Sequence, residues 1–275
     1  MVAQQSPKLF VKVRIFPLLH IMKIVFLGTN GWYTTPTGNT PCVLIDSKDQ
    51  YVVFDAGNGI YKLDKYITED KPISLFITHF HLDHVSGVHI FSKFNFKQGI
   101  DVYIGEGRKK DFETLFNPPF TSGYKPQPEN INNLRTEVRL HELSEGEHAT
   151  PFPISVAKLF HAYGNHGYRI TLEGKTIVYT GDCGPTDSLR KLAKDADLLI
   201  SECGQKKLLE DKKWGHLDPV LASIVAKDAS VKKLVLTHFG SAQFLTLEDR
   251  KKAERKAQEI SPNTTAAVDD LEITL

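Results

Sequence analysis

Four side chains of types that commonly bind metal ions occur within one six-residue segment. Residues 79–84 read His-Phe-His-Leu-Asp-His and follow directly on an apolar stretch. The candidates are His79, His81, Asp83 and His84. The apolar stretch predicts a strand, which would hold all four on one rigid turn at its end. Imidazole and carboxylate groups together suit zinc, and also manganese or iron. Because positions on such a turn point in different directions, the segment could serve two divalent metal ions.

Three further candidates stand at the ends of other predicted strands. His161 ends the strand predicted at residues 154–160, Asp182 stands in Thr-Gly-Asp, and His238 stands in Leu-Thr-His. A single histidine at a strand end is usually a hydrogen-bonded structural residue. The histidine-rich segment changes that expectation, because a metal site needs partners from elsewhere in the chain. We therefore expect all three to bind metal.

His166 is an alternative to His161, because it lies only five residues further along the chain. Only His161 directly caps the apolar strand, which favours His161. Four other histidines have no comparable context, and we expect them on the surface. These are His20, His89, His141 and His148.

A glutamate and a histidine form a second candidate pair. Glu202 follows the strand predicted at residues 197–201, and His216 stands in Gly-His-Leu just before a predicted helix. A glutamate that orients a histidine allows that histidine to donate a proton to a departing alkoxide. The pair therefore indicates acid catalysis, although a structural role for either residue alone fits the sequence equally well.

The elements that must position these residues alternate along the chain. Short runs rich in β-branched and aromatic residues predict strands at residues 23–27, 42–45, 51–54, 73–78, 154–160, 167–172, 175–179, 197–201 and 233–237. Helices are predicted at residues 85–93, 106–116, 187–194, 219 onward and 247–259. Asp218 and Thr246 are the expected N-caps of the last two. Strands come first and then alternate with helices, twice over, which predicts two sheets with helices outside in one α/β domain.

Residues 1–21 are predicted to be an N-terminal arm or an extra strand, ahead of a catalytic domain at residues 22–275. Residues 10–27 are fairly apolar, but charged residues and Pro17 interrupt them. No run reaches the length of a membrane span, and no small-residue cleavage site follows. We therefore expect no membrane association.

Composition excludes two further classes of protein. Thirty-four Lys and Arg against thirty-three Asp and Glu give a net charge of +1, which argues against a nucleic-acid coat protein and a polybasic membrane binder. Three scattered cysteines are too few for a disulfide framework and indicate the reducing cytoplasm. Cys183 and Cys203 directly follow Asp182 and Glu202, but we expect them to pack in the core rather than join the site.

The segment His-x-His-x-Asp-His resembles the signature of the metallo-β-lactamase superfamily, and the match extends over nearly the whole chain from Met22 onward. The resemblance implies a four-layer αββα sandwich with two mixed sheets and a hydroxide shared by two metal ions as the nucleophile. Asp55, in Phe-Asp-Ala-Gly, resembles the aspartate that supports the histidine loop without binding metal. The implied ligands are His79, His81 and His161 for one ion, Asp83, His84 and His238 for the other, and Asp182 as the bridge. Asp83 is also expected to be catalytic, together with His216 and Glu202.

Glu202, His216 and the Gly-Tyr-Arg sequence at residues 167–169 resemble ribonuclease Z and related phosphodiesterases. Ribonuclease Z proteins commonly carry a long tRNA-gripping arm between His161 and Asp182, but these residues are only 21 positions apart here (182 minus 161). A small or cyclic phosphodiester is therefore the expected substrate, with a nucleic acid end as a further candidate. The alternatives are a lactonase, thioesterase or β-lactamase-type hydrolase, and a non-catalytic binding module.

Residues 117–133 form the one long irregular stretch, with four prolines and two aromatic residues. Loops of this length often cover an active site, so this stretch is either a substrate-contacting loop or a plain surface excursion. The sequence also allows a homodimer.

Overall fold

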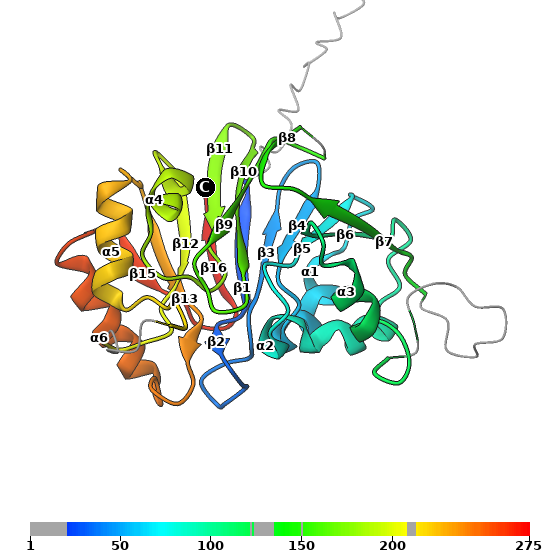
Figure 1. The fold of residues 1–275 in the computed structure, drawn as a ribbon, viewed down its shortest axis with the longest axis horizontal. Helices are drawn as coiled ribbons and strands as arrows, with labels where there is room; N and C mark the ends of the chain where they lie inside the picture. The colour runs from blue at the N-terminus through cyan, green and yellow to red at the C-terminus, as the bar shows by residue number, and fades with distance from the viewer. Residues whose placement is uncertain (1–20, 122, 124–134, 150, 208–212) are drawn as a thin grey trace, which may run out of the picture.

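The computed structural model describes residues 21–121, 123, 135–149, 151–207 and 213–275, and two mixed seven-stranded sheets dominate this part of the chain (Figure 1). The first sheet has the order β16 (Leu271–Thr274), β1 (Lys23–Gly28), β3 (Cys42–Asp46), β4 (Tyr51–Phe54), β5 (Ile73–Phe76), β6 (Ile100–Gly105), β7 (Val138–Leu143). The second has the order β15 (Thr264–Ala266), β13 (Leu234–Thr237), β12 (Leu198–Glu202), β11 (Lys175–Tyr179), β10 (Asn165–Leu172), β9 (Ile154–Leu159), β8 (Gly146–His148). Two short strands, β2 (Asn30–Gly31) and β14 (Phe239–Gly240), form a separate parallel pair. Because β2 follows β1 and β14 follows β13, this pair links the chain segments that leave the two sheets.

Helices cover the outer face of each sheet (Figure 1). The first sheet carries η1 (Asn58–Lys62), α1 (Leu63–Tyr66), α2 (Leu82–Val85), η2 (Ser86–Lys93) and α3 (Lys109–Leu115), where η marks a 3-10 helix. The second carries α4 (Asp187–Ala193), α5 (Pro219–Asp228) and α6 (Leu247–Gln258). The molecule is therefore the four-layer αββα sandwich that the sequence predicted.

Three apolar layers hold the sandwich together, and strand periodicity distributes residues among them. In β1, Ile24 and Phe26 point into the layer between the sheets, while Val25 and Leu27 point into the layer beneath the helices. Both faces of the strand are buried, which explains why it reads as a continuous apolar run rather than an alternating one. Each such side chain contributes roughly 1.5–3 kcal/mol of burial free energy.

The helix start signals in the sequence are confirmed. The Asp218 side chain accepts the Leu221 backbone N–H at the start of α5, and Thr246 forms a capping box with Asp249 at the start of α6. The stretch predicted as a helix at residues 85–93 is mostly the 3-10 helix η2. Seven strands of the structure were not predicted from the sequence: β2, β6, β7, β8, β14, β15 and β16. The residues of β7 and β16 are partly polar and exposed, because both strands lie at an edge of the first sheet.

Two expectations fall largely on residues that the structure does not describe. The N-terminal arm at residues 1–21 lies outside the described residues except for Ile21, and most of the loop at residues 117–133 does so too. Both stay predictions. Within the described ranges, no helix combines the length and apolar character needed to cross a bilayer.

Candidate metal centre

The histidine loop is shaped by the end of β5 and the start of α2. The Thr78 backbone N–H donates to Asp55 Oδ1 at 2.8 Å, which keeps the chain extended up to His79. His81 is then the N-cap of α2 with extended backbone angles, and α2 itself carries Asp83 and His84. An extended segment followed at once by a helical turn sends successive side chains in different directions.

The structure brings all seven predicted ligands together, in two groups. Within each group, one nitrogen or oxygen atom per residue lies within 4.8 Å of the others. The groups are His79, His81, His161 and Asp182, and Asp83, His84 and His238.

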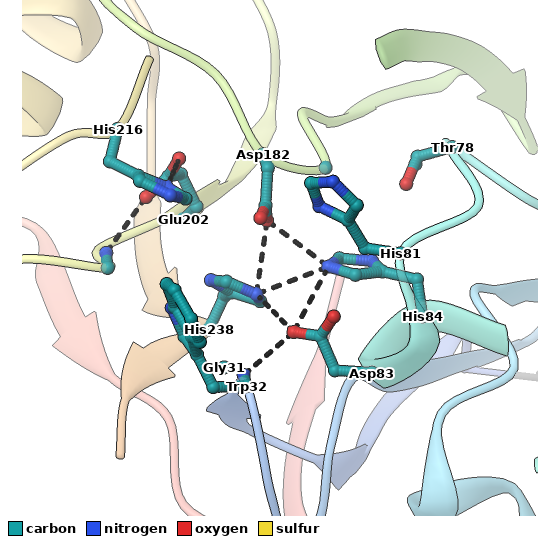
Figure 2. Close-up of polar contacts among 12 residues, drawn as sticks. Gly31, Trp32, Thr78, His81, Asp83, His84, Asp182, Glu202, His216 and His238 are labelled. Atoms are coloured by element: carbon teal, nitrogen blue, oxygen red, sulfur yellow. Dashed lines mark hydrogen bonds and ion pairs between the residues drawn. The ribbon is translucent and has the colours of Figure 1, made fainter. Parts of the chain in front are cut away.

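Asp182 lies between the two groups (Figure 2). Its Oδ2 is 3.9 Å from His79 Nε2, whereas its Oδ1 is 3.3 Å from His84 Nε2 and 3.1 Å from His238 Nε2. One carboxylate oxygen therefore faces each group, which is the geometry that a bridging ligand requires.

Unpaired polar atoms test whether these residues fit metal ions. Among the described residues, the buried His79 Nε2 makes no hydrogen bond within the protein, and the buried Asp182 Oδ1 has the imidazole nitrogens of His84 and His238 as its polar neighbours. A buried polar atom without a partner costs roughly 1–3 kcal/mol. The two atoms face the space enclosed by the other ligands, so divalent cations that accept nitrogen and oxygen donors fit the site.

Residues behind the ligands orient them. His84 Nδ1 lies 2.7 Å from the buried Asp55 carboxylate, which also accepts hydrogen bonds from Thr78 Oγ1 and from the Tyr179 hydroxyl at 2.8 Å. Asp55 thus holds the back of the histidine loop and is absent from both ligand groups. Such contacts fix the imidazole orientation and leave the other ring nitrogen for the metal.

Two other ligands have backbone supports. The Gly215 carbonyl lies 3.3 Å from His161 Nδ1, and the Trp32 backbone N–H donates to Asp83 Oδ2 at 2.7 Å. Gly31 packs against the His238 ring so closely that a Cβ atom there would lie 2.5 Å from its Cε1. Gly31 therefore needs to be glycine for the ring to keep its position.

The ligand carboxylates stay ionised because histidines surround them. Burial alone would raise the pKa of the Asp182 carboxyl, but nearby His238 and His84 hold that pKa well below its ordinary value. The same holds for the pKa of Asp83, where burial is outweighed mainly by His84 and His238. Burial lowers the pKa of His79 well below 6.5, and neighbouring His84 adds to this effect. Burial also lowers the pKa of His84 and His238, but the carboxylates, Asp182 first, outweigh it and raise both. The carboxylates and His79 therefore already have the protonation states that metal binding needs, whereas His84 and His238 would release a proton when an ion binds.

Glu202 and His216 lie beside the ligands (Figure 2). His216 Nδ1 is 2.9 Å from Glu202 Oε1, and the buried carboxylate also accepts the backbone N–H groups of Cys183 and Gly204. Burial opposes protonation of His216, but the Glu202 carboxylate outweighs it and raises the pKa of His216 to about 9. His216 is therefore an imidazolium at neutral pH, with one N–H held by Glu202.

An open cavity of about 270 Å³ gives access to the site. Its lining includes four of the candidate ligands together with His216: His81, Asp83, His161 and Asp182. His216 can therefore reach a group bound over the ligands.

The remaining sequence candidates lie elsewhere. His166 is on β10, where its ring packs against Gly105, and it belongs to neither ligand group. Cys183 and Cys203 pack in the apolar layer beneath α4 to α6. His89, His141 and His148 are exposed or half-buried, away from the ligands, and His20 is outside the described residues.

Several residues that contact the candidate ligands or their supports were not predicted from the sequence, among them Trp32, Tyr179 and Gly215. Tyr179 stands only three residues before Asp182, at the end of a predicted strand. That proximity was the only signal that linked it to the site.

The fold and the site define a metallo-β-lactamase-fold hydrolase. Residues 50–239 match the family described as beta-lactamase superfamily domain, and the chain belongs to that family. It is 28% identical over 229 residues to a probable metallo-hydrolase, YhfI, of Bacillus subtilis, covering 79% of this chain and 86% of the relative. It is 26% identical over 318 residues to ribonuclease Z of Archaeoglobus fulgidus, covering 92% and 98%.

Solved structures show the same fold. The crystal structure of B. subtilis YhfI superimposes with a TM-score of 0.76 at 24% identity, over 93% of this chain and 99% of that one. The short form of human tRNase Z gives a TM-score of 0.68 at 25% identity, over 91% and 98%. The chain is thus a metallo-hydrolase-family protein related to ribonuclease Z.

Proposed function

We propose that the protein is a phosphodiesterase with two metal ions, in which His216 donates a proton to the leaving group. The observation that carries this proposal is the buried Glu202–His216 pair, with His216 facing the cavity beside Asp182. Hydrolysis of an ester with a poor leaving group needs such an acid, because a departing alkoxide is a strong base.

The ligand set supports two divalent ions, with zinc as the first candidate and manganese or iron as alternatives. His79, His81 and His161 would hold one ion, Asp83, His84 and His238 the other, and Asp182 both. When bound, such a pair of ions lowers the pKa of a shared water and stabilises negative charge on a phosphate.

In this proposal, residues of the protein orient the proton donor and transfer the proton. Glu202 fixes the His216 ring through Nδ1, which leaves the Nε2 proton for the leaving oxygen. As a water oxygen bonds to phosphorus and the bond between phosphorus and the leaving oxygen breaks, the proton moves from Nε2 to that oxygen, which becomes an alcohol. In a cyclic diester this alcohol stays joined to the product through the second ester bond. Asp83 is held by the Trp32 N–H and acts as a ligand that is also close to the reacting group.

The substrate we propose is a small or cyclic phosphodiester. β10, the tight turn at Glu173 and Gly174, and β11 take up most of the chain between His161 and Asp182, so no extended arm is present there. The net charge of +1 also gives little general attraction for a long nucleic acid. The relatives named ribonuclease Z favour the second candidate, a nucleic acid end.

His216→Ala tests the proposal, with the exposed His89→Ala as matched control. On a cyclic nucleotide, whose leaving group is an alkoxide, we expect kcat to fall by about 10²–10⁴-fold, and less on bis-p-nitrophenyl phosphate, which has a better leaving group. Bound metal should not change. Unchanged turnover of the cyclic nucleotide would exclude the proton-donor role.

A substrate panel separates the other candidates. Chelator-sensitive turnover of a lactone or a cephalosporin, without phosphodiester turnover, would identify an ester or lactam hydrolase. No turnover together with less than one equivalent of metal would identify a binding module. The homodimer and the cytoplasmic location stay predictions, which light scattering and cell fractionation test.

A further inference from the structure

Both tryptophans of the chain lie at the mouth of the candidate metal centre. The sequence contains two tryptophans, Trp32 and Trp214, and both line the cavity over the metal ligands. The rings are 64% and 43% exposed, although burial would stabilise each of them strongly. The location of both tryptophans therefore indicates that they contact a bound ligand rather than pack in the core.

The same two residues border a second cavity. It has a volume of about 350 Å³ and adjoins the first, with Trp32, Trp214 and His216 common to both. Tyr33, Gln205 and Gln243 also line it. Apart from His216, which lies at the boundary with the first cavity, its described lining residues are uncharged at neutral pH, so the rest of the second cavity suits a neutral group.

The backbone holds Trp32 in place at the expense of strain. Its φ of 75° lies in the left-handed region, which is rare for a bulky residue. Its N–H is bonded to Asp83, and Ser241 Oγ lies within hydrogen-bond distance of the carbonyls of Gly31 at 2.8 Å and Tyr33 at 2.6 Å. The segment around Trp32 is thus fixed relative to a metal ligand.

Trp214 is fixed from the opposite side. Its carbonyl accepts the Ala162 N–H at 3.3 Å, and its ring lies 6.0 Å from that of Tyr163. The next residue, Gly215, has a φ of 71° and packs against Phe160 with no room for a side chain. Trp214 therefore keeps a defined position in the cavity that His161 and His216 also line.

We propose that the second cavity is the leaving-group subsite and that it binds a nucleobase against the indole rings. The proposal rests on the proposed function, since His216 then protonates the leaving oxygen at the boundary between the two cavities. The phosphate occupies the first cavity, and the nucleoside that carries the leaving oxygen occupies the second; in a cyclic nucleotide this nucleoside stays joined to the phosphate through its other ester bond. Aromatic rings stack on any base. The Gln243 side chain, whose Oε1 accepts the Lys206 backbone N–H, can donate from its amide nitrogen to a base edge.

A selectivity ratio tests the subsite. We would measure kcat/KM for adenosine 2′,3′-cyclic phosphate and for glycerol 1,2-cyclic phosphate, which has no base. Trp32→Leu and Trp214→Leu should each lower the ratio of the two values about 10-fold, the effect of losing one base–aromatic contact. Tyr61→Leu, which changes an exposed aromatic residue on η1, should leave the ratio unchanged. An unchanged ratio in both tryptophan variants would overturn the proposal.

Tryptophan fluorescence provides a second test that needs neither variants nor turnover. Because no other tryptophan is present, any emission change reports on these two positions. Adenosine should quench the metal-loaded wild-type protein saturably, and ribose should not. Absence of quenching by adenosine would overturn the subsite. Saturable quenching without hydrolysis of any phosphodiester would instead overturn the proposed function and support the subsite.

Discussion

The Asp55 carboxylate and the His84 imidazole form a fully buried pair, with 2.7 Å between Oδ2 and Nδ1. Asp55 stands at the end of β4 and His84 in α2, so the pair joins the sheet to the metal-ligand helix. The contact directs His84 Nε2 toward Asp182, 3.3 Å away.

Asp55→Asn should weaken metal binding by the group that contains His84, namely Asp83, His84 and His238. The amide cannot replace the carboxylate as acceptor for every one of its donors, so His84 loses its fixed orientation, and we expect about 10–100-fold lower metal affinity. Competition with a chromophoric chelator measures this. Tyr179→Phe removes a single donor to Asp55 and should have a smaller effect. Equal affinity in Asp55→Asn and wild type would contradict the supporting role.

The variants His161→Gln and His166→Gln test which of these two histidines binds metal together with His79, His81 and Asp182. His161 belongs to a ligand group and His166 does not, although they lie five residues apart. We expect His161→Gln to lose close to one equivalent of metal and His166→Gln to keep both, as measured by elemental analysis after dialysis. The reverse pattern would make His166 the ligand.

Removal of metal should destabilise the folded protein. Ions that bind only the folded state stabilise it by ~4 kcal/mol when the free ion is 1,000 times Kd. For a chain of this size, chelation should then lower Tm by on the order of 10 °C. Calorimetry with and without EDTA measures the shift, and His161→Gln should show a smaller one. Superimposable melting curves would argue against tightly bound ions.

Asp101 should contribute pH-dependent stability far from the site. Arg139 donates to both of its oxygens, at 2.9 and 2.8 Å, and His141 Nε2 lies 2.8 Å from Oδ1. Burial raises the pKa of Asp101, but the hydrogen bonds from Arg139 and His141 outweigh this and lower the pKa from 3.8. The stabilisation is therefore present above the unfolded value of the pKa and is lost as pH falls through the folded one.

Asp101→Asn should accordingly cost ~0.5–1 kcal/mol of unfolding free energy at neutral pH. The difference from wild type should shrink as the pH is lowered from about 5 to about 2. Urea unfolding across this range measures it, with the exposed Asp70→Asn as control. A difference that grows on acidification would reverse the assigned sign.

Local features of the site and fold could be predicted from the sequence. His79, His81, Asp83 and His84 are neighbours along the chain, so their proximity needs no tertiary information. The same is true of the Asp218 N-cap, which acts within one helical turn. The order of short apolar runs and helices also predicted two sheets with helices outside, and the resemblance to the metallo-β-lactamase superfamily implied the four-layer arrangement.

Only the tertiary structure decided how distant segments meet. Trp32 and Trp214 border the same cavities although 182 positions separate them (214 minus 32). Their meeting depends on the sheet order, on the register of β2 with β14, and on left-handed backbone at Trp32 and Gly215. Such contacts between remote residues depend on the packing of the whole chain, which no local pattern of residues encodes.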